Sequence, residues 1–245
     1  ACARSVTDQK LYVRSPTDPL FLPIANSPLG TADVIVTDQR IVMTVGIAGD
    51  NRLISWSDRE NYNTWTPAIT NMAGDFRVSG SGKLVAIKKV QNQILVIGEN
   101  DAFAGQFLGP PYIYGFNRIG DKCGAVSATA VAATSDFAMW FGMDTFWMFD
   151  GTLKNIPCSV LEFMLKDMDS GQKSKICAFT NSDYDEVWWL YQSSGAIDCD
   201  SYVVYNYKDR VWYLGKIDRT VGLDDAALKY LTMVSKTGVV FDHEI

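Results

Sequence analysis

The residue types with chemical potential in this sequence are one histidine, one glycine-rich loop and scattered carboxylates. His243 is the only histidine and lies near the end of the 245-residue sequence. A Ser-His-Asp or Cys-His arrangement would have to be built on it, and an exposed terminal imidazole is a poor general base without a partner that orients it. The scarcity of histidine also argues against the common His-rich metal sites.

The glycine-rich loop Ser79-Gly80-Ser81-Gly82-Lys83 resembles part of a phosphate-binding loop. The full motif requires a glycine at the position of Arg77 and a serine or threonine at the position of Leu84. Because both are missing, we expect a turn that leads into a strand beginning at Leu84.

Carboxylates are plentiful, and most lie in segments rich in turn residues, where Asp hydrogen-bonds its own backbone. A glycosidase would need two of them a few ångströms apart in a cleft. The run Asp183-Tyr184-Asp185-Glu186 lacks the spacing and the glycine of a calcium loop. We therefore predict no catalytic, cofactor-binding or metal-binding residue and no enzymatic activity. The carboxylates considered are Asp144, Asp150, Asp183, Asp185, Glu186, Asp198 and Asp200.

The overall composition is that of an acidic globular protein. Asp and Glu number 28 against 22 Lys and Arg, which gives a formal net charge of −6. That balance disfavours a protein that grips nucleic acid, because neutralising phosphates requires Lys and Arg. The five cysteines show no C-x-x-C spacing, so we expect reduced thiols made in a cytoplasm. No apolar run approaches the roughly 20 residues of a membrane span.

Residues 1–32 contain Pro16, Pro19, Pro23 and Pro28. Proline lacks a backbone donor and fixes φ, so this stretch is expected to be an irregular arm rather than part of a sheet. The β body is expected to span residues 33–245. The sequence begins with Ala instead of Met, which suggests a piece of a longer chain.

From residue 33 onward, short apolar segments alternate with runs of turn residues, which predicts β-hairpins. Five hairpins are expected, pairing residues 33–36 with 41–45, 84–88 with 94–98, 128–133 with 137–141, 176–180 with 187–191, and 230–234 with 239–241. Further aromatic strands are expected at 103–107, 145–149, 202–205 and 211–214.

The hairpins recur at intervals of roughly 45–55 residues, the range typical of propeller blades. A unit of three or four antiparallel strands cannot cover its own apolar faces, so units must stack. The repeats therefore predict an all-β, propeller-like fold, with a pair of β-sandwiches as the alternative.

One segment departs from the strand pattern. Residues Ser159–Met168 place apolar side chains at helical spacing, which predicts a short inserted helix with Ser159 as its cap. Residues 222–229 could form a second helical turn.

Aromatic residues gather in two of the predicted units, in the segments 140–149 and 188–213. We expect most of them to fill the space between sheets, although a sugar-stacking or protein-binding surface is the alternative. Strand alternation places Trp188 and Trp189 on opposite faces of their sheet. The residues concerned are Trp140, Phe141, Phe146, Trp147, Phe149, Trp188, Trp189, Tyr191, Tyr205, Tyr207, Trp212 and Tyr213.

A series of short phrases, in order along residues 33–215, resembles the stabilisation proteins of short-tailed bacteriophages, also called tail hub or nozzle proteins. The phrases include Trp56-Ser57-Asp58, Trp65-Thr66-Pro67, Ala73-Gly74-Asp75, Gln106–Tyr112, Gly115-Phe116, Cys123-Gly124, Trp140–Asp144, Phe149-Asp150-Gly151 and Pro157-Cys158.

The resemblance implies a β-propeller that forms a ring, expected to be a hexamer, below the portal and adaptor rings of a virion tail assembled in the host cytoplasm. Such a ring retains the packaged DNA, conducts it during ejection without binding it specifically, and anchors tail fibres or spikes. The family suggests no catalytic residues and no cofactor. The alternative is a carbohydrate-binding or carbohydrate-cleaving propeller used in receptor recognition.

Overall fold

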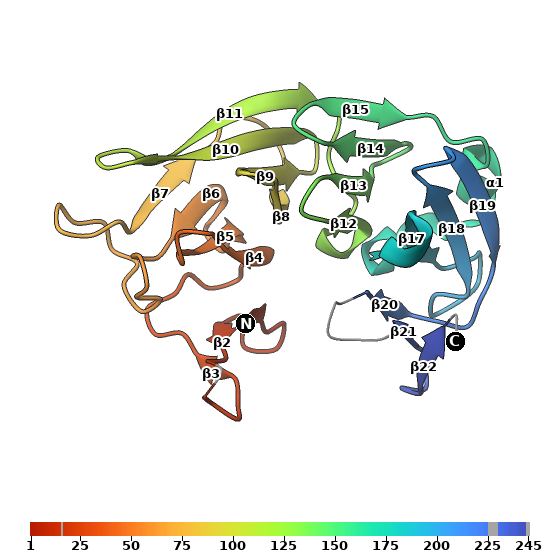
Figure 1. Ribbon diagram of the computed structural model, residues 1–245, viewed down its shortest axis with the longest axis horizontal. Coiled ribbons are helices and arrows are strands. Elements are labelled where there is room, and N and C mark those ends of the chain that lie inside the picture. Colours follow the sequence, from red (N-terminus) through yellow and green to blue (C-terminus); the bar gives the residue numbers. More distant parts are fainter. Residues whose placement is uncertain (16, 225–229, 244–245) are drawn as a thin grey trace. The chain divides into compact units, whose positions relative to one another are not determined.

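The structure is a computed structural model that describes residues 1–15, 17–224 and 230–243. The chain divides into two compact units, Ala1–Gly124 and Ala125–Ile245. Each unit contains three antiparallel sheets, and each sheet is a meander of strands in chain order (Figure 1).

The described residues of the first unit form eleven strands in three sheets. These are β1 (Cys2–Arg4), β2 (Leu11–Val13) and β3 (Leu22–Pro23); β4 (Asp33–Val36), β5 (Val42–Ile47), β6 (Asp50–Trp56) and β7 (Gly74–Arg77); and β8 (Leu84–Val90), β9 (Gln93–Gly98), β10 (Asp101–Gly109) and β11 (Ile113–Asp121). The first strands of successive sheets contact one another, β1 with β4 and β4 with β8. Propeller blades pack in this way.

The second unit repeats the pattern with a helix between two of its sheets. Its strands are β12 (Val131–Ala133), β13 (Ala138–Phe141), β14 (Phe146–Phe149) and β15 (Leu153–Ile156); β16 (Cys177–Asn181), β17 (Glu186–Tyr191), β18 (Ser201–Asn206) and β19 (Val211–Lys216); and β20 (Val221–Leu223), β21 (Leu231–Val234) and β22 (Val240–His243). The helices are η1 (Ala128–Ala130), α1 (Leu161–Asp167), η2 (Ser170–Lys175) and η3 (Ser182–Tyr184). Here β16 contacts both β12 and β20.

All five predicted hairpins are antiparallel strand pairs in the structure. The strands at 103–107, 145–149, 202–205 and 211–214 are also confirmed, within β10, β14, β18 and β19. One boundary is wrong, because Ala128–Ala130 forms a 3-10 turn. The side chain of Ser127 caps that turn by accepting from the Ala130 amide at 3.1 Å.

The prediction of an irregular arm at residues 1–32 is wrong, because the segment forms the three-stranded sheet β1–β3. Pro23 does lie in a strand, but that strand has two residues and is at the edge of its sheet. A proline is tolerated there because its missing donor faces no partner strand. Leu11 and Ile24 from this segment are buried in a cluster with Val42 and Trp65.

The helix predicted at Ser159–Met168 is present as α1, seven residues long. Its N-cap is Val160, without a side-chain cap, so the prediction of Ser159 as cap is wrong. Met164 and Met168 are buried, whereas Phe163 is exposed, since a surface helix directs only one stripe of side chains inward. Of the second predicted turn, Gly222 and Leu223 lie in β20 and residues 225–229 lie outside the described residues.

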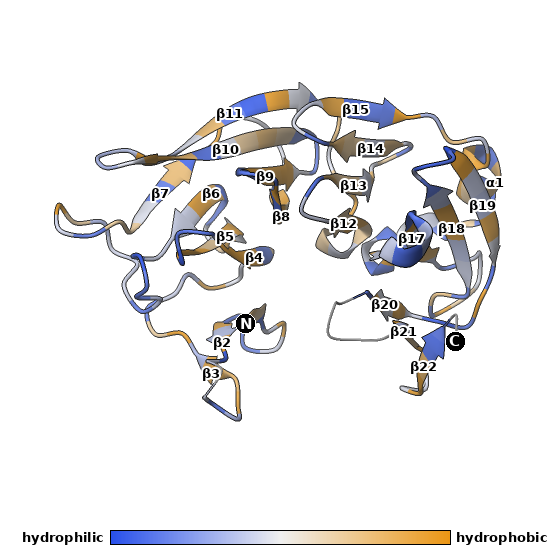
Figure 2. Ribbon diagram, viewed as in Figure 1, coloured by the Kyte–Doolittle hydropathy of each residue, from blue (hydrophilic) through white to orange (hydrophobic). Residues whose placement is uncertain are grey.

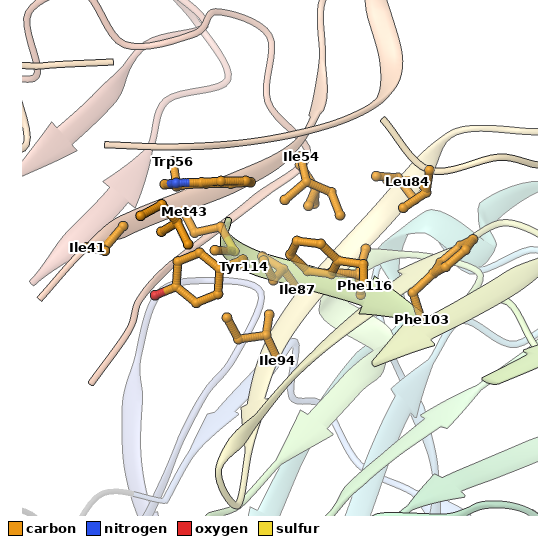
Figure 3. Packing of buried hydrophobic residues seen from close by; sticks show 14 residues of the cluster. Ile41, Met43, Ile54, Trp56, Leu84, Ile87, Ile94, Phe103, Tyr114 and Phe116 are labelled. Carbon is orange, nitrogen blue, oxygen red and sulfur yellow. The ribbon is translucent and has the colours of Figure 1, made fainter. Parts of the chain in front are cut away.

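The core of the first unit lies between the β4–β7 and β8–β11 sheets. It joins aliphatic side chains from β5, β6, β8 and β9 with Phe103, Tyr114 and Phe116 from the β10–β11 hairpin (Figure 3). Figure 2 shows orange and blue segments along β11, whose first half is mostly buried and whose second half is half-buried or exposed. None of the helices in the described part of the chain is long and apolar enough to span a membrane.

Candidate interaction surface

The β6–β7 strand pair in the first unit begins with a close contact between Trp56 and Gly74. These two residues are direct cross-strand partners. A Cβ atom on Gly74 would lie 2.6 Å from Cζ2 of Trp56, so the indole ring occupies the space that a side chain would need. The Trp56 Nε1 donates to the carbonyl of Met72 at 2.8 Å. The tryptophan is thereby fixed against the far strand, and only glycine fits opposite it.

The loop between β6 and β7 is held at both ends by its own side chains. Asp58 Oδ1 accepts from the Met72 amide at 2.9 Å, which ties the start of the loop to its end. The Trp65 Nε1 donates to the carbonyl of Tyr62 at 2.7 Å, and the Trp65 ring is buried. The loop is therefore built to a fixed shape, and Ile69 at its outer part is fully exposed.

The β10–β11 hairpin extends beyond its neighbours and carries apolar side chains at its tip. Leu108 is 59% exposed and Tyr112 is 76% exposed. The Pro110–Pro111 bond in the turn is cis. A Cβ atom on Gly115 would lie 2.9 Å from Cδ1 of Leu108, so the leucine covers a glycine across the hairpin.

These two segments meet along a groove of about 510 Å³, which we call the hairpin groove. One side comes from the β6–β7 loop and β7, and the other from the hairpin. Its lining is mainly apolar and comprises Trp56, Pro67, Ala73, Gly74, Asp75, Phe76, Leu108, Pro111, Tyr112, Ile113, Tyr114 and Gly115.

Aromatic contacts connect the groove with the core. The rings of Trp56 and Tyr114 meet edge to face at 5.4 Å, and those of Phe107 and Tyr114 at 5.3 Å. Figure 3 shows Trp56 and Tyr114 close together among the buried residues. Burial raises the pKa of Tyr114 above its ordinary value. The groove wall is thus continuous with the packed core, and a preformed wall of this kind suits a partner of complementary shape.

The aromatic residues singled out in the sequence mostly fill the core of the second unit. Trp140, Phe141, Phe146, Phe149 and Trp189 are almost fully buried. Trp188 and Trp189 belong to different clusters, so the predicted alternation is confirmed. The other members of the set are less buried: Trp147, Trp188, Tyr207 and Trp212 are half-buried, and Tyr213 is half-exposed.

The structure does not gather the candidate chemical residues into one site. His243 Nε2 accepts from Nε of Arg219 at 3.2 Å. The Ser79–Lys83 segment is a turn before β8, as predicted, and its carbonyls accept from Arg52. None of the seven carboxylates lines either of the two clefts found in the first unit. Within the described ranges, no group of His, Cys, Asp or Glu is arranged to hold a metal ion.

None of the five cysteines, all of which lie among the described residues, forms a disulfide. Burial raises the pKa of Cys123 and of Cys158 to about 11, and that of Cys199 to about 12. A thiol acts as a nucleophile only as the thiolate, so these groups are unreactive near neutral pH.

Sequence reasoning did not find the hairpin groove, because its walls come from segments about 50 residues apart. One signal was available. Leu108 and Tyr112 flank a Gly-Pro-Pro turn, where neither strand pairing nor a core requires large apolar side chains.

Comparison with known proteins identifies the fold class. No protein-family model matches the chain, and no curated protein matches it. Among solved structures it is similar to Hsv2 from Kluyvelomyces marxianus, with a TM-score of 0.53 and 11% identity over 98% of this chain and 71% of that chain. It is also similar to the N-terminal domain of Nup159, with a TM-score of 0.49 and 12% identity over 86% of this chain and 59% of that chain.

The chain spans less than two thirds of the Nup159 chain that it matches. Hsv2 is a β-propeller, and at this level of identity the likeness shows the fold alone. This chain is a β-propeller whose six sheets are the blades. The propeller predicted from the strand repeats is confirmed, and the alternative of two sandwiches is set aside.

Proposed function

We propose that this chain is a structural protein of a short-tailed phage tail, a subunit of the hub or nozzle ring that retains packaged DNA, conducts it during ejection and anchors fibres or spikes. Its partners would be the adaptor and portal rings, the fibres or spikes and further copies of itself, six in the ring. It would act through surfaces rather than through catalysis, at the virion tail after assembly in the host cytoplasm.

The observation that carries the proposal is the convergence of separate resemblance phrases on the hairpin groove. Trp56-Ser57-Asp58 and Ala73-Gly74-Asp75 are coupled through the Trp56–Gly74 contact. Leu108, Pro111 and Tyr112, from the phrase Gln106–Tyr112, belong to the opposite wall. Phrases separate in the sequence thus meet at one groove.

The exposure of the groove rim supports a role in assembly. Leu108 and Tyr112 line the preformed groove and present apolar surface to solvent. Contiguous exposed apolar surface of this kind marks sites that a partner covers. A subunit whose groove receives another part of its neighbour makes a heterologous contact, and such contacts form a ring when the rotation between subunits closes.

The formal charge of −6 fits the conduction of DNA. Net negative surfaces repel the phosphate backbone, so a genome could pass such a ring without sticking to it.

The test is co-sedimentation of the full gene product with DNA-filled phage heads that lack tails. We expect the wild-type protein to sediment with the heads and to stop DNA leakage. The variant Leu108→Asp should lose both effects, because it places a charge in the groove wall. Ile197→Asp is the control, since Ile197 is also an exposed aliphatic residue but lies in the second unit.

Failure of the wild-type protein to bind heads or retain DNA would overturn the proposal. Equal activity of Leu108→Asp and Ile197→Asp would leave the tail role standing but remove the groove from it.

A further inference from the structure

A second cleft in the first unit is rich in side-chain amides. Its volume is about 680 Å³, and it lies where the β4–β5 turn, the β8–β9 turn and β10 come together. Five of its lining residues are Gln39, Gln91, Asn92, Gln93 and Gln106. We call it the amide cleft.

The amide side chains can both donate and accept hydrogen bonds. Each carries one acceptor oxygen and an NH₂ group with two donor hydrogens. One of them is oriented by a buried residue: the Tyr114 hydroxyl lies 3.1 Å from Gln39 Oε1 and 3.0 Å from Thr37 Oγ1. A ligand that is both donor and acceptor along its length matches such a lining, and a sugar hydroxyl is both.

The cleft also has an aromatic wall. Phe107 is 38% exposed, and its ring is held edge to face against Tyr114 at 5.3 Å. The face of such a ring packs well against the C–H surface of a pyranose, while the amides meet the hydroxyls at its edge. Clefts of this size with an apolar wall and a few convergent polar groups are typical of ligand sites.

The charges of the cleft indicate a neutral ligand that is bound and not cleaved. Lys89 Nζ and Asp38 Oδ1 form an ion pair, so the cleft carries no excess positive charge to attract an acidic sugar or a phosphate. Asp38 is the only carboxylate among the described lining residues. Hydrolysis of a glycosidic bond by the usual route needs two carboxyl groups.

We propose that the amide cleft binds a neutral oligosaccharide, with Phe107 as the stacking platform and the surrounding amides as partners of its hydroxyls. The proposal does not depend on the tail assignment, because the cleft would serve recognition of a surface glycan in either setting.

The test uses the purified chain on a glycan array that carries neutral hexose and N-acetylhexosamine oligosaccharides beside sialylated, sulfated and phosphorylated ones. We expect retention of neutral glycans. The Phe107→Ala variant and the Asn92→Ala/Gln106→Ala double variant should each weaken it at least about tenfold, the loss of one or two good contacts. Asn117→Ala is the control, because Asn117 is an exposed amide on β11 outside the cleft.

Asn92 and Gln106 are exposed, so the melting temperature of the double variant should match that of the wild type. Phe107→Ala also removes the ring contact with Tyr114, so the double variant decides the test if Phe107→Ala melts at a lower temperature. Three results would overturn the proposal: no neutral glycan retained, retention of acidic glycans only, or equal binding by the cleft variants and Asn117→Ala. A random-peptide library panned in parallel tests the competing hypothesis that the cleft binds a peptide. Peptides that lose binding in the double variant, with no glycan retained, would assign the cleft to an extended peptide instead.

Discussion

The guanidinium of Arg52 and the carboxylate of Asp101 form a bidentate ion pair that is almost completely excluded from solvent. Arg52 Nη1 lies 3.0 Å from Asp101 Oδ1, and Nη2 lies 2.9 Å from Oδ2. The side chains are 3% and 0% exposed. Arg52 also donates to the carbonyl of Ser79 at 2.8 Å, so the pair fastens the glycine-rich turn to two sheets of the first unit.

Breaking this pair should strongly destabilise the first unit. Asp101→Asn leaves the buried guanidinium without its counter-charge, and removing one partner of a buried pair costs about 3–5 kcal/mol. Arg77→Ala is the matched control, because it breaks the exposed pair between Arg77 and Asp50, where a loss of about 0–1 kcal/mol is expected. Urea unfolding of both variants measures the difference. Similar losses of unfolding free energy in the two variants would show that the buried pair stabilises the protein no more than the exposed pair does.

The two tryptophans Trp189 and Trp147 should differ in what they contribute to stability. Trp189 is fully buried, and its Nε1 donates to the carbonyl of Ala130 at 3.1 Å. Trp189→Ala is expected to cost about 3–5 kcal/mol through the cavity it leaves. Trp147 is half-buried, so Trp147→Ala should cost clearly less. Thermal melting of both variants checks the order, and an inverted order would contradict the burial shown by the structure.

Much of the strand pattern could be predicted because it depends on local sequence. In the hairpin of β4 and β5, for example, apolar segments flank a short turn, and that pattern is visible within a dozen residues. The sheet of β1–β3 could not be predicted in this way. Its strands have two or three residues, and its stability depends on Leu11 and Ile24 packing against Val42 and Trp65 further along the chain.

The hairpin groove and the amide cleft were hidden for the same reason. Each is formed by turns and strand ends that are distant in sequence. Two glycines illustrate what the sequence alone could not show. Gly74 is required because Trp56 packs against it, and Gly115 because Leu108 does, rather than because either lies in a turn. Only the packing of β7 on β6 and of β11 on β10 reveals that requirement.

The buried thiols should resist alkylation, and they should lower the stability of the protein at alkaline pH. With the pKa of Cys199 at about 12 and that of Cys123 at about 11, fewer than about one thiol in a thousand is a thiolate at pH 8. Iodoacetamide at pH 8 should therefore modify neither in the native protein and both in denaturant, as read by mass spectrometry. Rapid native labelling of Cys199 would contradict the burial.

The pH dependence of stability follows from the same raised thiol pKa values. Above the ordinary thiol pKa of 9.0, the unfolded chain loses protons that the folded chain keeps. The unfolded state then binds fewer protons, so the free energy of unfolding falls as pH rises. Denaturant midpoints at pH 8 and pH 10 should show this loss. Replacing Cys199 with Ala should reduce the difference between the two midpoints.

Gly124 should be intolerant of any side chain because backbone atoms lie against it. A Cβ atom there would lie 2.0 Å from the carbonyl oxygen of Glu99 and 2.1 Å from its carbonyl carbon. These atoms belong to the chain between β9 and β10 and cannot move aside without shifting the sheet. Gly124→Ala is expected to cost at least about 1–3 kcal/mol.

Gly171→Ala is the control, since its nearest neighbour would be the flexible carboxylate of Asp169 at 3.3 Å. Urea unfolding should separate the two variants. Equal stability would mean that the segment at Glu99 can yield, and that the glycine in the Cys123-Gly124 phrase serves a purpose other than packing.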